Sequence, residues 1–412
     1  MALASLLINR LFTRLLASET LNTTSSAMLA LSAPLLAIAL MDADAFDVGL
    51  LAASSTAAPL LFGLSAGALA DRLDRQRTLL CCGLVRLGLV AAVAVLFAFG
   101  HMSIPLLAVA GFVLSAVKLL FDAVIVAAIP TVVPRAALVR ANSWYEASNS
   151  AACAGGPMAA GWALQLLPAA MVYWLVTVLY LASAWLAAGL GLRSPTQAGR
   201  RAPSHIADIA ESVRLLWNSP VQRAIAVAAG VFNLFHTAFF TVFAYHAVTR
   251  LGFSAASYGT VISLVGLSGL LSALLAPRLL GKLGTRAMLI GTLLLTAPLG
   301  MPILYADAMP FLGRAAVVVA CLAAWDFLIV LHLIVEHTVR QATVPGDQLG
   351  RISAVTRFVS WGADPVGAVM GGLLATTALG TFGTLLVCLA GFLLAGVVLL
   401  ASTRIRTLDI EL

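Results

Sequence analysis

Long uninterrupted apolar segments are the feature that most constrains how this chain can fold. A helix needs about 20 mostly apolar residues to cross the hydrocarbon core of a bilayer, and twelve segments of the chain reach that length. None alternates apolar and polar residues as a membrane β-strand does. The sequence therefore predicts an all-α membrane protein with twelve transmembrane helices. The expected spans are 15–40, 48–70, 78–100, 104–130, 141–166, 169–192, 221–247, 255–277, 287–306, 314–338, 352–377 and 381–402.

The composition agrees with lipid as the main solvent of the side chains. Hydrophobic residues make up 61% of the chain and charged residues only 10%, whereas a soluble domain carries about 25% charged residues. All five cysteines lie inside apolar segments. They are therefore expected to be buried thiols and not a disulfide framework.

Basic residues mark every second loop between the expected spans. One group lies at 72–77, and others lie at 135–140, 278–286 and 340–351. The intervening loops are poor in Lys and Arg, and the loop at 42–47 carries three aspartates. Because basic loops stay on the cytoplasmic side, we expect a multi-pass protein of the cell (inner) membrane with both termini cytoplasmic. The same pattern leaves no basic face for nucleic acid.

The spans fall into two sets of six, separated by the polar segment 193–220, whose second part can form an amphipathic helix along the cytoplasmic interface. Arg140 recurs as Arg351, 211 residues later, and Gly156 recurs as Gly367 at the same separation. Paired six-helix repeats are the architecture of rocking transporters. The expected domains are an N-terminal six-helix bundle (1–192), a cytoplasmic linker (193–220) and a pseudo-symmetric C-terminal six-helix bundle (221–412).

The sequence after the second span resembles a known signature. Residues 67–77 read Gly-Ala-Leu-Ala-Asp-Arg-Leu-Asp-Arg-Gln-Arg, which is similar to the motif between helices 2 and 3 in the major facilitator superfamily. Asp74 and Gln76 depart from that motif, where a Gly and a basic residue are usual. The resemblance implies a charge latch at the cytoplasmic side that holds one conformational state and breaks in the other. The gate residues that it implies are Gly67, Asp71, Arg72 and Arg75.

A second motif lies in the fifth span. Gly156-Pro157 and Gly161 resemble the antiporter motif of the superfamily's exporter branches, and Gly and Pro permit bending and close packing of membrane helices. The linker run at 211–220 and Asn142 further resemble the drug-exporter-like twelve-helix subgroup. The resemblance covers nearly the whole chain and implies a drug:proton antiporter without a cofactor. Packing glycines with no directional role are the alternative interpretation.

Charged residues inside the spans are candidates for function, because an isolated charge in a bilayer is costly. Lys118 and Asp122 lie one helical turn apart on one face. They could form a static ion pair, or Asp122 could accept a proton when Lys118 is displaced. Lys118 also matches a basic position in the superfamily's fourth helix. The candidates for proton coupling or for binding substrate charge are Asp122, Lys118, Glu19, Asp326 and Glu336.

Polar and aromatic residues of other spans are candidates for a central cavity that takes an apolar ligand. His332 and Glu336 share a helical face, which would permit a metal site. Hydrogen-bonded cavity histidines are the preferred interpretation, and no resident metal is expected. The cavity candidates are Asn22, Phe235, His236, Phe239, Trp325 and His332.

The predicted function is secondary active transport, namely proton-coupled efflux of an amphiphilic or drug-like small molecule by alternating access. The expected partners are that substrate, protons and membrane lipid, and a monomer is expected. An importer or uniporter of a metabolite or lipid, a divalent metal exporter and a non-transporting membrane assembly factor remain alternatives. The sequence shows no nucleophile–base or metal constellation with enzyme-like spacing and no ATP-binding loop, so it does not predict an enzyme.

Overall fold

The computed structural model describes residues 10–134, 137–192 and 205–407. These residues fold into helices joined by short turns, and no strand occurs among them, so the prediction of an all-α chain is confirmed. Lipid favours this outcome, because a helix satisfies its backbone N–H and C=O groups within the segment and leaves none unpaired in the bilayer core.

The first six long helices follow the first six expected spans. Capping residues fix some of their ends. The carboxylate of Asp74 accepts a hydrogen bond from the backbone N–H of Arg77 (2.7 Å) and caps the helix that begins at Arg75. The helices are α2 (Arg10–Leu40), α3 (Ala45–Arg72), α4 (Arg75–Ala98), α5 (Ile104–Val132), α6 (Leu138–Leu166) and α7 (Ala169–Ala188).

The remaining helices include the described part of the linker and the last six spans. Gly284 lies inside the longest helix with φ +76° and ψ 159°, a conformation that glycine adopts far more readily than other residues. The chain therefore turns there between two expected spans. The helices are α8 (His205–Asn218), α9 (Pro220–Thr249), α10 (Ala255–Gly300), the 3₁₀ helix η2 (Met301–Ala308), α11 (Phe311–Thr343), α12 (Gly346–Ala375), α13 (Gly380–Ala401) and α14 (Thr403–Arg406).

Ten helical segments of the described chain are long and apolar enough to cross a membrane. One of them, Ala255–Ala308, contains the two spans that meet at Gly284. A further long helix, α6, coincides with the span expected at 141–166, but its Gly, Asn and Ser residues make it less apolar than the ten. The arrangement is compatible with the predicted twelve spans.

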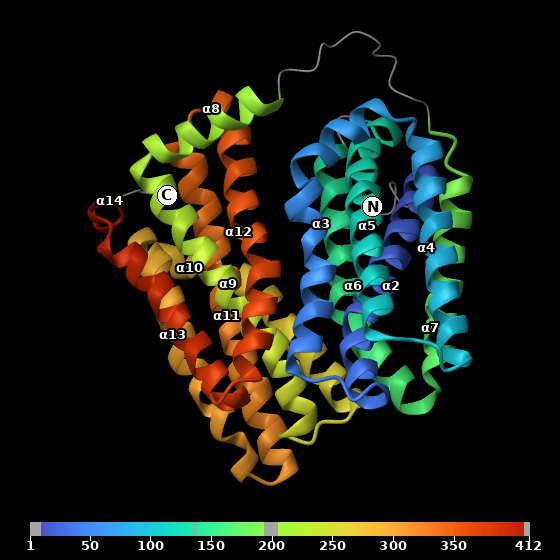
Figure 1. Ribbon diagram of the computed structural model, residues 1–412. Coiled ribbons are helices and arrows are strands. Elements are labelled where there is room, and N and C mark those ends of the chain that lie inside the picture. Colours follow the sequence, from blue (N-terminus) through green and yellow to red (C-terminus); the bar gives the residue numbers. More distant parts are fainter. Residues whose placement is uncertain (1–9, 135–136, 193–204, 408–412) are drawn as a thin grey trace. The chain divides into compact units, whose positions relative to one another are not determined.

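The contacts divide the chain into two compact units, which we describe separately. Unit 1 comprises Met1–Asp42, Ser54–Gly199 and Ser254–Ser263; unit 2 comprises Ala43–Ala53, Arg200–Phe253 and Leu264–Leu412. In unit 1, α2 packs against α5, α6 and α7, and α4 packs against α5 and α7 (Figure 1). Gly156 makes the α2–α6 approach close, because a Cβ there would lie 3.2 Å from the carbonyl oxygen of Thr24.

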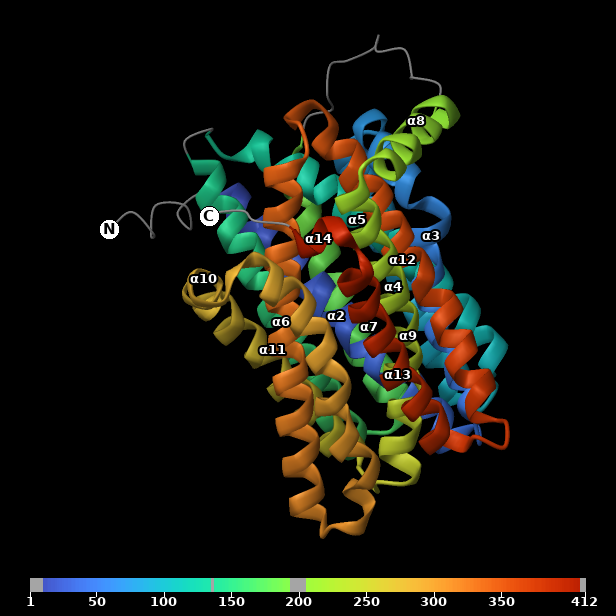
Figure 2. The ribbon, with the colours of Figure 1, turned by 90° about the vertical axis from the view of Figure 1, so that its left-hand side faces the viewer.

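In unit 2, α9 runs beside α12 and α13 in both views (Figure 1, Figure 2). Gly371 of α12 permits this approach, because a Cβ there would lie 2.8 Å from Cα of Ala238 on α9. The amphipathic helix α8 lies obliquely at the end of α12 (Figure 1). It is held there by buried Leu216 and by an ion pair from Glu211 to Arg351 (2.9 Å).

Candidate functional site

A buried carboxyl group lies on α2 in unit 1. Only 1% of Glu19 is exposed, and its two oxygens accept hydrogen bonds from Asn22 Nδ2 (3.3 Å) and Thr23 Oγ1 (3.0 Å). The three residues meet because positions three and four apart share a face of the helix. Both donors are neutral, so no cation directly balances a charge on Glu19 among the described residues.

A buried guanidinium group, which was not among the candidates from the sequence, lies next to this carboxyl group. Arg86 of α4 is 1% exposed and donates a hydrogen bond from Nη1 to Asn22 Oδ1. Its Cζ lies 4.8 Å from the ring centroid of Phe121 and 5.8 Å from that of Tyr180, within the range of cation–π contacts. Arg86 was detectable as a charge inside an expected span, by the same criterion that selected Glu19.

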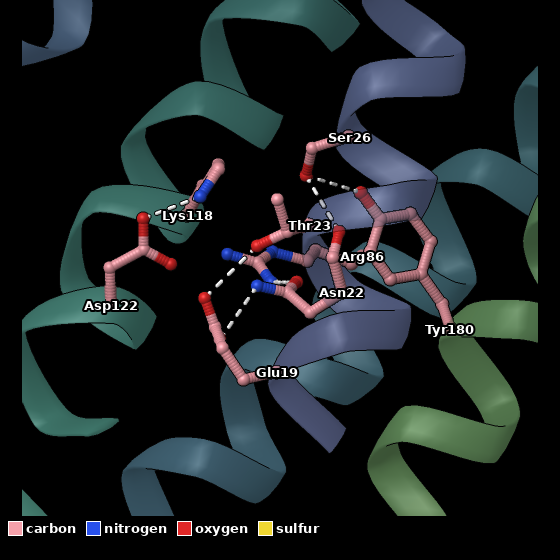
Figure 3. A network of polar contacts seen from close by, with 8 residues as sticks. All are labelled: Glu19, Asn22, Thr23, Ser26, Arg86, Lys118, Asp122 and Tyr180. Atoms are coloured by element: carbon pink, nitrogen blue, oxygen red, sulfur yellow. Dashed lines mark hydrogen bonds and ion pairs between the residues drawn. The ribbon is translucent and has the colours of Figure 1, made fainter. Parts of the chain in front are cut away.

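The Lys118–Asp122 pair on α5 completes the cluster (Figure 3). Lys118 Nζ lies 2.5 Å from Asp122 Oδ2, and each side chain is 31% exposed. The second oxygen, Asp122 Oδ1, is buried and has no hydrogen-bond partner among the described residues. Glu19 lies within electrostatic range of Asp122, Lys118 and Arg86. We call these four charged residues together with Asn22 the charge cluster.

Other polar residues of α2 contribute little to a cavity. The hydroxyls of Thr24, Ser25 and Ser26 donate to backbone carbonyls four residues earlier in the same helix. Ser26 Oγ also lies 3.2 Å from the hydroxyl of Tyr180. Asn22 is fully buried, so it connects Glu19 to Arg86 and does not face an open space.

Several of the aromatic residues expected to line a cavity lie together in unit 2. The rings of His236 and Trp325 are parallel within 5° at a centroid distance of 5.1 Å, and Phe232 and Phe240 pack on both. Phe239 stacks on Phe243. The Trp325 indole nitrogen is buried without a partner in the described part of the chain.

Two carboxylates of unit 2 accept hydrogen bonds from hydroxyl groups on other helices. Asp326 Oδ2 accepts from Ser268 Oγ (2.7 Å), which joins α11 to α10. Asp364 Oδ1 accepts from Thr237 Oγ1 (2.8 Å), which joins α12 to α9. Asp364 was absent from the sequence candidates, although an acidic residue within a span is a sufficient signal.

Glu336 lies in a buried ion pair with Arg340, one turn later on α11. His332 lies at the edge of this pair: its Nε2 is 3.9 Å from Glu336 Oε2, and its Nδ1 is 3.1 Å from Thr292 Oγ1. Within the described residues, no group of three or more His, Cys, Asp or Glu side chains is arranged to hold a metal ion.

The two motifs lie at helix contacts and helix ends. In α6, Gly161 faces the start of α10, where a Cβ would lie 3.2 Å from Gly259 Cα, and Pro157 lies within the same helix. The side chains of Asp71 and Arg72 and the surroundings of Gly67 lie outside the described part of the structure. Arg75 begins α4.

Next to Arg75, the side chain of Gln76 has a clear structural role. It donates to the carbonyl oxygen of Ala187 (2.9 Å) and accepts from the backbone N–H of Leu192 (3.2 Å). An amide can make both bonds, whereas the basic residue usual at this position can only donate. The departure from the motif therefore ties the start of α4 to the end of α7.

Helices of membrane-spanning length that carry charged side chains in a buried cluster define a multi-pass membrane protein. Similarity to known proteins establishes the family. The chain belongs to the Major Facilitator Superfamily, whose family model matches residues 15–363. A curated relative, the multidrug efflux pump Tap of Mycolicibacterium fortuitum, is 28% identical over 394 residues, covering 89% of this chain and 90% of the relative.

Solved transporter structures share the fold. A bacterial homologue of the iron transporter ferroportin in an inward-facing state matches with a TM-score of 0.72 and 19% identity, over 94% of this chain and 97% of that one. The D-xylose-proton symporter matches with 0.72 and 14%, over 98% of each chain. The nucleoside transporter NupG matches with 0.72 and 14%, over 97% and 100%. The chain is thus a membrane transporter of this superfamily and not an enzyme.

Proposed function

We propose that this transporter exports an amphiphilic or drug-like small molecule and is driven by protons that flow inward. The relative that spans nearly the whole chain is a multidrug efflux pump, which supports export and a broad substrate class. Unit 2 offers aromatic surface around His236 and Trp325 that suits a flat apolar ligand.

The charge cluster is the observation that carries the proton coupling. Two carboxyl groups and two cations lie together inside spanning helices, where each unpaired charge is costly. Adding or removing one proton therefore changes which pairs are favourable, and that change can bias a two-state transporter. Asp122 is part-exposed, so it is the group that can receive a proton from water. It can then exchange that proton with buried Glu19.

Alternating access between an N-terminal bundle (1–192) and a C-terminal bundle (221–412) would convert this bias into transport. The inner-membrane location with cytoplasmic termini belongs to the same proposal, and it rests on the alternation of basic loops.

The test is transport by purified protein in proteoliposomes, with and without an imposed pH gradient, for a panel of amphiphilic drugs. Glu19→Gln and Asp122→Asn are expected to lose gradient-driven accumulation and to keep drug binding. Asp307→Asn is the matched control, because Asp307 is exposed and lies outside the charge cluster. Undiminished gradient-driven transport by both cluster variants would remove the coupling assignment. Movement of the drug in the same direction as the protons would indicate an importer.

A further inference from the structure

Asn22 lies between a buried acid and a buried cation and is hydrogen-bonded to both. We propose that Asn22 holds Arg86 away from Glu19 while Glu19 carries a proton, and that Arg86 becomes the counter-ion of Glu19 when the proton leaves. This inference rests on the proton coupling proposed above. It adds a named switch partner, Arg86, and a positioning residue, Asn22.

The contacts of Glu19 suit a neutral carboxyl group. It is 1% exposed, its partners are a neutral amide and a neutral hydroxyl, and it makes no ion pair with a described residue. A carboxylate removed from water needs a cation or several hydrogen bonds to remain charged. Loss of the proton therefore requires Glu19 to gain a partner.

Arg86 is suited to be that partner. Only Nη1 is engaged, by Asn22 Oδ1, while Nε and Nη2 are buried without hydrogen-bond partners in the described structure. A guanidinium group binds a carboxylate through two parallel N–H groups, and these two nitrogens are available. The side-chain amide of Asn22 is bonded to both residues: its nitrogen donates to Glu19, and its oxygen accepts from Arg86. Figure 3 shows the amide placed between them.

Other titratable groups surround the same place. Asp122 is the competing acceptor for Arg86, because its Oδ1 is also buried and unpaired with any described residue. The test must therefore separate Glu19 from Asp122. The groups within electrostatic range of Glu19 are Arg86 from α4, Lys118 and Asp122 from α5, and Tyr145 and Cys153 from α6. Cys82 and Tyr180 lie near Arg86, and Glu146 lies near Tyr145.

The experiment is an infrared titration of the full-length protein in lipid, which follows the carbonyl stretch of protonated carboxyl groups. The Glu19 band is the one lost in Glu19→Gln. In Asn22→Ala the amide spacer is gone, and direct pairing should move the half-titration of this band by about 1–3 pH units to lower pH. In Arg86→Gln the counter-ion is gone, and the half-titration should move to higher pH.

Thr23→Val is the matched control. Thr23 also donates to Glu19, but the hydrogen bond of Arg86 goes to Asn22 and not to Thr23. Removing only a hydrogen bond to the carboxylate should move the half-titration to higher pH, opposite to Asn22→Ala. Asn22→Ser and Arg86→Lys serve where the first variants fold poorly. Asn22→Ser should shift in the direction of Asn22→Ala, and Arg86→Lys should stay closer to the wild type than Arg86→Gln.

A shift of Asn22→Ala in the same direction as Thr23→Val would overturn the proposal, and so would shifts confined to a band that Asp122→Asn removes. The titration requires no transport. Opposite shifts in a protein that moves no drug would leave the switch standing and end the drug-efflux proposal. Gradient-driven drug transport without these shifts would leave the drug-efflux proposal standing and end the switch.

Discussion

Two ion pairs of the same chemistry differ in burial and allow a direct test of what each contributes. In the Glu336–Arg340 pair the side chains are 7% and 4% exposed, whereas in the Glu211–Arg351 pair they are 58% and 43% exposed. Breaking a buried pair leaves a stranded charge and costs about 3–5 kcal/mol. An exposed pair is worth roughly 0–1 kcal/mol. Arg340→Met should therefore destabilise the protein by at least about 2 kcal/mol more than Arg351→Met.

The assay is unfolding of the purified protein by SDS in mixed micelles, followed by circular dichroism at one fixed pH. A difference of 2 kcal/mol corresponds to roughly a 30-fold change in the unfolding equilibrium constant, which is well resolved. Adding Glu336→Gln to Arg340→Met removes the stranded charge and should recover most of the loss. If the double variant is as unstable as Arg340→Met, the lost packing of the arginine stem explains the effect and the charge argument is wrong.

The same variants bear on function. Glu336 was a coupling candidate from the sequence, yet both its partners lie on its own helix. If the pair is structural, the Glu336→Gln/Arg340→Met double variant should keep gradient-driven transport. Loss of pH-dependent transport in a stable double variant would return Glu336 to the coupling residues.

Three further outcomes are expected. Gly371→Val places a side chain where a Cβ is already 2.8 Å from Ala238 Cα, so it should destabilise by about 1–3 kcal/mol, while Gly88→Val, with nothing within 4 Å, should have a much smaller effect in the same SDS assay. Zn²⁺ and Fe²⁺ should leave thermal stability unchanged, because the described residues form no metal-binding group; a large stabilisation would favour a metal exporter. In a cysteine-free background, a membrane-impermeant thiol reagent should label a cysteine at His101 from outside the cell and one at Arg77 only after lysis; the reverse pattern would invert the proposed topology.

Features that depend on nearby residues could be predicted from the sequence. The spans follow from apolar length, and the Lys118–Asp122 and Glu336–Arg340 pairs follow from a spacing of four in a helix. The boundary expected between the spans 255–277 and 287–306 corresponds to the turn inside α10 at Gly284, where φ is 76° and ψ is 159°.

Contacts between helices could not be predicted in this way. Arg86 and Asn22 are 64 residues apart, and Asp364 and Thr237 are 127 apart. Helix rotation and packing decide such pairs, and neither is encoded in a local pattern. The polar residues after Glu19 on α2 show the same limit, because three hydroxyls bond to carbonyl groups of their own helix and the Asn22 amide bridges Glu19 and Arg86.

The repeat of 211 residues relates packing glycines and the basic residues Arg140 and Arg351, but it does not extend to the charge cluster. Gly156 and Gly367 both allow close helix approach, yet the residues 211 positions after Arg86, Lys118 and Asp122 are Ala297, Ile329 and Leu333. The charge cluster therefore has no counterpart at the matching positions of unit 2, where Asp326 and Asp364 are hydrogen-bonded to hydroxyls and the buried Glu336–Arg340 pair lies within one helix. In the proposed mechanism this asymmetry separates two tasks within a fold of two similar bundles, because the charge cluster would respond to protons while the aromatic residues around His236 and Trp325 would bind the substrate.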